Sequence, residues 1–238
     1  MTTLDAETMV GSLVADRPAR ARVFEPFGID YCCGGKRTLG QACERAGIDL
    51  DEVVAALAES DLAATNETER GEDWSSLTEL ADHIVATHHV NLRRELPRLA
   101  AMLDEVVAAH GERHAELPDL RAAFIDLRNE LEPHMEKEER ILFPMIRELE
   151  QAASAPASHR GTVNHPIRVM EDEHRNAALA LTRMRDLTGG YAPPDDACNT
   201  YRVLLDGLAD LERDLHMHIH KENNILFPQA ADAERRLT

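Results

Sequence analysis

The sequence has few aromatic side chains, no long hydrophobic run and no excess of positive charge. One Trp, three Tyr and five Phe among 238 residues leave little material for the aromatic pairs that stabilise β-sheets. No apolar stretch approaches the ~20 residues that a membrane-spanning helix requires. The first residues also lack a basic segment followed by an apolar one. We therefore expect no secretory signal, no membrane partner and a cytoplasmic protein.

Charge and cysteine content exclude further classes of protein. There are 44 acidic and 26 basic residues, so the net charge of −18 repels the phosphate backbone of nucleic acids. The four cysteines have neither the spacing of a zinc finger nor that of a disulfide framework. This pattern fits a reducing compartment. We assign no role to Cys43 or Cys198.

The residues that do dominate are Ala, Leu, Glu and Arg, which favour helices. The sequence therefore predicts an all-α protein. We expect a small helical domain over residues 1–65, a linker over 66–76, and an up-down-up-down four-helix bundle over 77–238, because short connections make neighbouring helices antiparallel. The bundle helices are expected over residues 77–110, 119–150, 166–188 and 195–230.

Two stretches of the predicted bundle repeat the pattern H-x-x-x-E-x-x-I-L-F-P. One copy begins at His134 and the other at His218. Residues four apart share one face of a helix, so each His projects with its Glu, Glu138 or Glu222. The apolar residues on either side recur in alternating steps of three and four, which marks the inward face of a bundled helix. Both pairs are therefore predicted to point into the bundle.

The other two bundle helices each place one His on the same inward face. On the first helix His89 continues the apolar series, whereas the series from its neighbour His88 leads to the polar Asn91 and Glu95. On the third helix His174 continues the series. Each half of the bundle thus contains one helix with a single inward His followed by one with the His–Glu pair, which indicates an internal duplication.

These inward side chains predict a metal centre. A lone inward His is more often a hydrogen-bonded core residue than a ligand. An ionised carboxylate in a dry core, however, costs several kcal/mol unless it is paired or binds a metal. The expected ligands are His89, His134, Glu138, His174, His218 and Glu222.

The composition of this ligand set predicts which metal it holds. Six ligands are too many for one tetrahedral zinc. Imidazole and carboxylate without thiolate suit iron or manganese, and di-iron carboxylate centres are built inside helix bundles. We expect two Fe ions, bridged by the two carboxylates and by an oxo or hydroxo group, with positions open to O₂ or NO.

For two further acids and for the remaining histidines, the sequence gives weaker evidence of a functional role. Glu130 lies four residues before His134, and Glu173 directly precedes His174. Either is a candidate to order a ligand or to guide iron, with a solvated acid as the alternative. The remaining histidines fall off the inward faces or in loops, and we expect them to be structural or solvated: His83, His88, His110, His114, His159, His165, His216 and His220.

A pair of adjacent cysteines, Cys32 and Cys33, lies in a glycine-rich loop of the N-terminal region. Adjacent cysteines seldom form a disulfide with each other, because the bridge requires a particular Cβ geometry. One interpretation is a pair of small buried side chains. The other is redox chemistry or transient holding of iron, with the pKa of a thiol lowered by backbone N–H groups or by Lys36.

Specific motifs in both parts of the chain resemble one family. These are D-Y-C-C-G-G-K at residues 30–36, V-M-E-D-E-H at residues 169–174, and the two E-x-x-I-L-F-P copies. Over nearly its whole length the chain resembles the repair-of-iron-centres family of di-iron proteins, of the YtfE/ScdA type. The resemblance implies a ScdA-type N-terminal domain before a hemerythrin-like one. It also implies the same six iron ligands, a path for iron near Glu130 and Glu173, and a role in repair for Cys32 and Cys33.

The resemblance implies a function as well. It predicts a stress-response protein that restores iron–sulfur clusters damaged by nitric oxide or oxidants, by supplying iron to damaged iron–sulfur proteins. The alternatives are reduction of nitric oxide or nitrite at the di-iron centre, and binding of O₂ or NO. The extra N-terminal domain argues against simple ligand storage, for which a bare bundle would suffice. We expect a monomer or a homodimer.

Overall fold

The computed structural model describes residues 4–63, 74–152 and 162–237, and these ranges consist of helices and their connections. Within them, β-type pairing is limited to an isolated bridge between Met9 and Thr38. The predicted all-α class is therefore confirmed. None of the described helices is long and apolar enough to cross a membrane. The expected linker over 66–76 falls largely outside the described residues, and so does His159.

The N-terminal region forms a group of short helices around its own core, which includes Phe24, Leu39 and Cys43. Thr38 caps one of these helices by accepting a hydrogen bond from the backbone N–H of Gln41, and Gly47 ends the same helix in the left-handed conformation. The elements are α1 (Val10–Asp16), η1 (Pro18–Arg20), α2 (Ala21–Phe24), α3 (Leu39–Ala46) and α4 (Leu50–Ala63).

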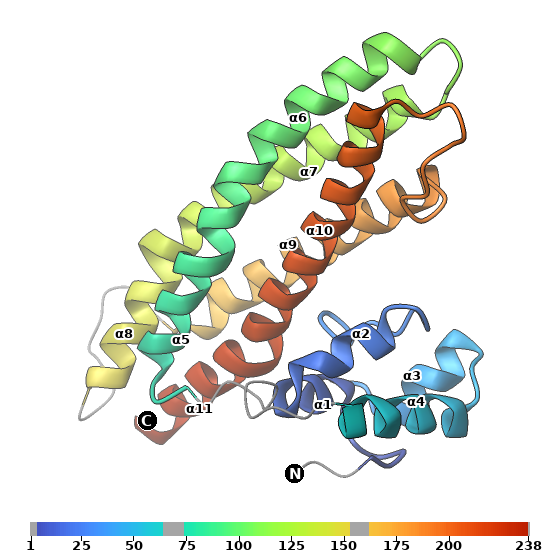
Figure 1. The fold of residues 1–238 in the computed structure, drawn as a ribbon. Helices are drawn as coiled ribbons and strands as arrows, with labels where there is room; N and C mark the ends of the chain where they lie inside the picture. Colours follow the sequence, from blue (N-terminus) through green and yellow to red (C-terminus); the bar gives the residue numbers. More distant parts are fainter. Residues whose placement is uncertain (1–3, 64–73, 153–161, 238) are drawn as a thin grey trace.

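The rest of the chain forms four long rods, three of them interrupted by a π-helical segment (Figure 1). The first rod is α5 (Leu77–Ile84), η3 (Val85–His89) and α6 (Val90–His110). The second is α7 (Leu117–Lys137), η4 (Glu138–Leu142) and α8 (Phe143–Gln151). The third is α9 (Asn164–Leu187). The fourth is α10 (Asn199–Lys221), η5 (Glu222–Leu226) and α11 (Phe227–Leu237).

The last rod differs from its expected range at both ends. It begins at Asn199 rather than at 195, because Ala197 closes a turn onto the carbonyl of Pro194 and Cys198 is still extended. It continues past 230 to Leu237, since no Gly or Pro follows Pro228 to end it.

Two of the π-helical segments have a cause in the repeated motif. Each copy ends in Phe-Pro, and proline has no N–H to donate within a helix. Immediately before it, the N–H of Phe143 bonds to the carbonyl of Glu138, and that of Phe227 to the carbonyl of Glu222, five residues back instead of four. π-Helical turns of this kind are frequent at functional sites. The Glu of each copy is the first residue of its widened turn.

The core of the bundle is divided along its length into two apolar clusters. One joins α6, α7, α9 and α10, from Leu92 to Leu215. The other joins α5, α8 and α11 with the start of α9, from Leu77 to Ala230. On every rod the predicted ligands lie where one cluster gives way to the other, although His134 is still followed by a residue of the first cluster, Met135. The polar layer is thus enclosed by apolar side chains on both sides.

The N-terminal region packs against the last rod. Ile219 of α10 belongs to the N-terminal core. The side-chain amide of Asn224 donates to the carbonyls of Tyr31 at 3.2 Å and Cys32 at 2.9 Å. Glycine is required at position 35, because a Cβ there would lie 2.6 Å from the backbone carbonyl oxygen of Tyr31. These contacts hold the cysteine loop beside the bundle.

Candidate metal centre

The structure brings all six predicted ligands together in the polar layer of the bundle. Each is at most 2 % exposed. They form two overlapping groups, and within each group the potential ligand atoms lie within 4.8 Å of one another. One group is His89, Glu138, His218 and Glu222, and the other is His134, Glu138, His174 and Glu222. Both carboxylates are therefore common to the two groups.

The imidazole rings meet in pairs through their Nε2 atoms. These atoms are 3.2 Å apart for His89 and His218, and 3.1 Å apart for His134 and His174. Two ligand atoms at about 2.1 Å from one metal ion lie roughly 3.0–3.4 Å from each other. The spacing of each pair is that of two ligands to one cation.

The carboxylates of Glu138 and Glu222 are faced by the imidazoles of the same cluster but accept no hydrogen bond. Glu138 lies 3.3 Å from Nε2 of His89, and Glu222 lies 3.1 Å from Nε2 of His174, but these contacts lack hydrogen-bond geometry. All four carboxylate oxygens of Glu138 and Glu222 are buried without a hydrogen bond. Such groups are costly unless they are paired or bind a metal. The residues therefore fit a site for metal cations.

The electrostatics of the centre show how it balances charge without a cation. Burial alone would lower the pKa of His134, but the carboxylates of Glu138 and Glu173 outweigh burial and raise it to about 10. Burial alone would raise the pKa of Glu138, yet His134 and His89 hold it well below its usual range. A proton on His134 thus offsets the charge of Glu138, and a bound cation competes with this proton.

Three of the four histidines are oriented by a partner on Nδ1. His89 bonds to Glu139 at 2.7 Å, and His134 to Glu173 at 2.8 Å. His174 bonds to Asn223 at 2.9 Å. An Nδ1–H donated to such a partner leaves the lone pair of Nε2 directed at the metal.

Sequence reasoning missed Glu139 and Asn223, although the duplication contains a signal for them. Each is the residue that directly follows the Glu of its copy, and each reaches a His on another helix. Their equivalent positions in the two copies of H-x-x-x-E-x-x-I-L-F-P are the signal that the sequence offers.

The fourth histidine is supported differently. Nδ1 of His218 is buried without a hydrogen bond. Its ring stacks on that of His88, with ring centres 5.5 Å apart and planes inclined by 5°. Nδ1 of His88 bonds in turn to Asp214 at 2.7 Å. His88 is therefore buried, as His89 is, but it supports the centre from outside instead of entering it.

The two acids singled out in the sequence occupy different environments. Glu173 is partly buried and bonds to both His134 and Lys137. Glu130 is exposed on α7. The structure thus places Glu173 against a predicted ligand and Glu130 at the surface.

The cysteine loop lies against the helix that contains His174. The thiol of Cys33 is 3.7 Å from the backbone carbonyl of His174. The Cys33 side chain and burial both raise the pKa of Cys32 well above its usual value, and Lys36 pairs with Glu171 at 2.7 Å instead of with a thiol. The expectation of a lowered thiol pKa is therefore wrong for Cys32, which is held as a thiol.

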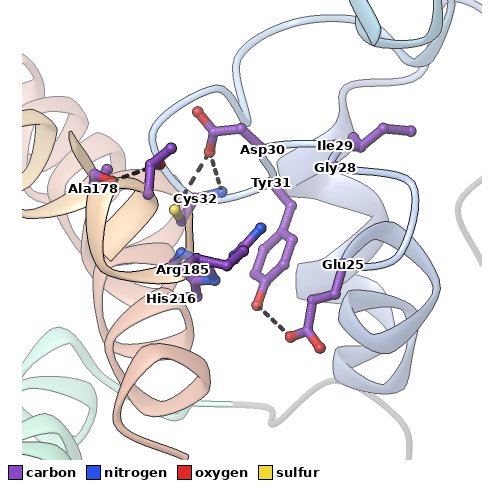
Figure 2. A pocket seen from close by; sticks show the side chains of 10 residues that line it. Glu25, Gly28, Ile29, Asp30, Tyr31, Cys32, Ala178, Arg185 and His216 are labelled. Carbon is purple, nitrogen blue, oxygen red and sulfur yellow. Dashed lines mark hydrogen bonds between the residues drawn. The ribbon is translucent and has the colours of Figure 1, made fainter. Parts of the chain in front are cut away.

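Cys32 borders a cavity of about 150 Å³ between the cysteine loop and helices α9 and α10. Figure 2 shows Asp30 and Cys32 on one side of this cavity, with Arg185 and His216 of the bundle helices next to them. Burial and the nearby Arg185 lower the pKa of His216 to about 4, so its ring is neutral near pH 7. The cavity thus joins the buried thiol to polar side chains of the bundle.

Comparison with known proteins agrees with both halves of this description. The family "Hemerythrin HHE cation binding domain" matches residues 80–230. The family ScdA_N, described as a domain of unknown function (DUF542), matches residues 6–61. The first of these matches, over more than half of the chain, fits the cation site inferred from the geometry.

Full-length relatives are similar over almost the whole chain. A protein of Cronobacter sakazakii named iron-sulfur cluster repair protein YtfE is 37% identical over 228 residues, covering 95% of this chain and 97% of the relative. Proteins of the same name from Yersinia pestis (strain Pestoides F) and Dickeya chrysanthemi are each 38% identical, covering 94% of this chain and 97% of the relative. The resemblance drawn from the motifs is confirmed.

Proposed function

Because this chain belongs to the hemerythrin-domain family of iron–sulfur cluster repair proteins, we propose that it supplies iron to iron–sulfur proteins whose clusters have been damaged. The observation that carries this proposal is the pair of buried carboxylates, Glu138 and Glu222, which lack hydrogen bonds and are shared by two pairs of histidines. Their arrangement favours two cations side by side over one.

The centre proposed here holds two iron ions. His89 and His218 are the ligands of one, His134 and His174 those of the other, and Glu138 and Glu222 bridge the two. Imidazole and carboxylate suit iron at such a position. When bound, the pair of ions supplies redox-active Lewis acids with positions open to water, O₂ or NO.

The protein's own residues suit the release of iron as well as its binding. Because the pKa of His134 rises to about 10 beside Glu138, this imidazole takes up a proton when a cation leaves. This proton then offsets the charge of Glu138 after the cation has left. Uptake of protons should therefore accompany iron transfer.

The cysteine loop is proposed as the exit for iron. The thiol of Cys33 lies beside the backbone of the ligand His174, and Cys32 borders the cavity between the loop and the bundle. Cysteine sulfur is a good ligand for iron that is to enter a cluster, and iron binding would displace the thiol proton that Cys32 holds. In this scheme Glu173 holds His134 in position and Glu130 lies on the path by which iron enters.

Each proposed domain has its own role in this function. Residues 1–65 contain the exit loop, 66–76 connect the domains, and 77–238 contain the metal centre. The proposed partners are damaged iron–sulfur proteins, with nitric oxide or O₂ as small ligands, in the cytoplasm, and the chain acts as a monomer or homodimer.

The test is a transfer experiment with ⁵⁷Fe. The ferrous ⁵⁷Fe-loaded protein is mixed anaerobically with an apo iron–sulfur protein, sulfide and a ferrous chelator that traps free iron. We expect ⁵⁷Fe to enter the cluster of the acceptor, and the double variant Cys32→Ser, Cys33→Ser to keep its iron but transfer it more slowly. Iron found only in the chelator would contradict donation, and undiminished transfer by the double variant would contradict the cysteine exit.

A further inference from the structure

A second cluster of side chains with metal-binding chemistry lies at the other end of the bundle. It combines His110, the last residue of α6, with His114 in the following connection and with Asp196 and Cys198 in the connection before α10. Both connections lie at the end of the bundle away from the N-terminal region (Figure 1). Because α6 has 21 residues and an α-helix rises ~1.5 Å per residue, this cluster is about 30 Å from His89.

The distances within the cluster suit a single cation. His110, His114 and Asp196 offer ligand atoms within 4.8 Å of one another. Nε2 of His110 is 3.2 Å from Sγ of Cys198, and Nε2 of His114 is 2.9 Å from Oδ1 of Asp196. Ligands of one tetrahedral ion are separated by roughly 3.0–3.5 Å. Cys198 meets this cluster through His110 and does not lie within 4.8 Å of all three other ligands, so its exposed side chain must rotate towards His114 and Asp196 to complete the site.

The histidines and the thiol are held in place by the surrounding fold. The backbone N–H of His114 bonds to the carbonyl of His110 at 3.0 Å, and both rings pack on Tyr201. His110 is 5 % exposed. Cys198 is the N-cap residue of α10, but its side chain makes no capping bond, and its sulfur is directed at His110 instead.

We propose that His110, His114, Asp196 and Cys198 form a second metal site that takes Zn²⁺ or a similar borderline-soft divalent ion. Two imidazoles, a carboxylate and a thiolate make a tetrahedral set typical of zinc, and the thiolate distinguishes it from the iron centre. Binding releases the proton of the Cys198 thiol to solvent. The bound ion would tie the α6–α7 connection to the α9–α10 connection and stabilise this end of the bundle.

The guanidinium of Arg113 supplies a positive charge beside this cluster. Its guanidinium donates to Nδ1 of His110 at 3.2 Å and lies 3.3 Å from Asp196. Neutral His110 therefore carries its proton on Nε2, and metal binding moves this proton to Nδ1 by exchange with solvent. The Arg113 side chain is 60% exposed, so it can swing away as the ion enters.

The test uses Co²⁺ as a spectroscopic substitute for Zn²⁺. The full chain is first loaded anaerobically with ferrous iron, freed of excess metal, and titrated with Co²⁺. We expect a thiolate-to-cobalt charge-transfer band with the intense visible bands of tetrahedral cobalt, and displacement of both by Zn²⁺. Elemental analysis must show that the iron stays bound, and Zn²⁺ must raise the melting temperature.

Matched variants show which side chains are needed for the cobalt bands. Cys198→Ser and His114→Ala should lose the bands and the shift in melting temperature, whereas Cys33→Ser, which removes the other partly accessible thiol, should keep them. Arg113→Gln should bind at least as tightly, because a competing positive charge is gone. The proposal is overturned if the bands are absent, if they survive in Cys198→Ser, or if Arg113→Gln binds much more weakly.

Discussion

Glu138 and Glu222 are the residues at which stability and function conflict. Their four carboxylate oxygens are buried without hydrogen bonds, so they are costly to fold in the absence of a cation. Replacing a buried charged network by apolar side chains is often neutral or stabilising by about 1–4 kcal/mol. The metal centre is therefore expected to be retained for iron binding and not for folding.

Glu138→Leu separates the two roles. We expect most of the iron to be lost, because both groups of ligands share this carboxylate. Without metal, the variant should lose less stability than the ~3–5 kcal/mol of a broken buried ion pair, because His134 can release its proton once the carboxylate is gone. Iron per chain is measured by elemental analysis and stability by urea unfolding. Glu136→Leu, on the exposed side of the same helix, is the control and should keep its iron; full iron content in Glu138→Leu would refute the assignment.

Glu173 tests how much a single hydrogen bond to a predicted ligand, His134, contributes to metal affinity. Removing the partner of a metal-bound His typically costs about 10–100-fold in metal affinity. Glu173→Gln should weaken iron binding by this factor, since a neutral amide is a poorer partner for His134 than a carboxylate. Affinity is measured by competition with a ferrous chelator. Glu130→Gln is the matched comparison: its exposed side chain should affect only the rate of iron entry.

At the scale of elements, the rods are joined by contacts that cap helix ends. The carboxylate of Glu150 on α8 accepts from the backbone N–H of Leu77 at 2.7 Å and of Thr78 at 3.1 Å, at the start of α5. It thereby satisfies donors that have no partner within their own helix. The first rod is fixed to the second in this way.

This cap has a defined pH dependence. Burial alone would raise the pKa of Glu150, but the bonds from Thr78 and Leu77 lower it. The stabilisation is therefore complete above the unfolded pKa, about 4.3, and is lost as the pH falls through the lower folded value. Glu150→Gln should cost about 1 kcal/mol at pH 7, by analogy with other caps, and less in acid. Urea unfolding at several pH values checks this; an equal cost at low pH would contradict it.

The helices contain one feature that could be predicted from the sequence, the ligand layer, and one that could not, the π-helical turns. The inward positions of His89 and His174 follow from the steps of three and four between apolar residues, so the ligand layer was predictable. The π-helical turns at Glu138 and Glu222 were not, because propensities and periodicity assume hydrogen bonds four residues back. Glu139 and Asn223 lie in these turns, which is why their contacts with the histidines were missed.

At the scale of the whole molecule, the position of the cysteine loop depends on contacts with backbone. Asn224 donates to the carbonyls of Tyr31 and Cys32, and His220 contacts the carbonyl of Tyr31 at 3.3 Å. Main-chain carbonyls are the same for every residue type, so the sequence contains no signal for this docking. The motif around Cys32 and Cys33 was evident, but its place beside His174 was not.

Substitutions at two neighbouring residues, Asn223 and Asn224, should distinguish the docking of the cysteine loop from metal binding. Asn224→Ala should lose two hydrogen bonds, worth about 0.5–1.5 kcal/mol each, and should speed the labelling of Cys32 by a thiol reagent while iron content is kept. Asn223→Ala should lower the iron affinity through His174 and leave labelling unchanged. Labelling followed by mass spectrometry, with iron analysis, checks both. Equal behaviour of the two variants would contradict this separation.

The proposed di-iron centre is tested most directly by the amount and the state of the iron that the chain binds. The protein is loaded anaerobically with excess ⁵⁷Fe²⁺, freed of unbound metal, and examined by elemental analysis and Mössbauer spectroscopy. We predict two ferrous ions per chain, which become antiferromagnetically coupled on oxidation and are lost in Glu138→Leu. A chain that retains no iron, or only one uncoupled ion, would contradict this prediction.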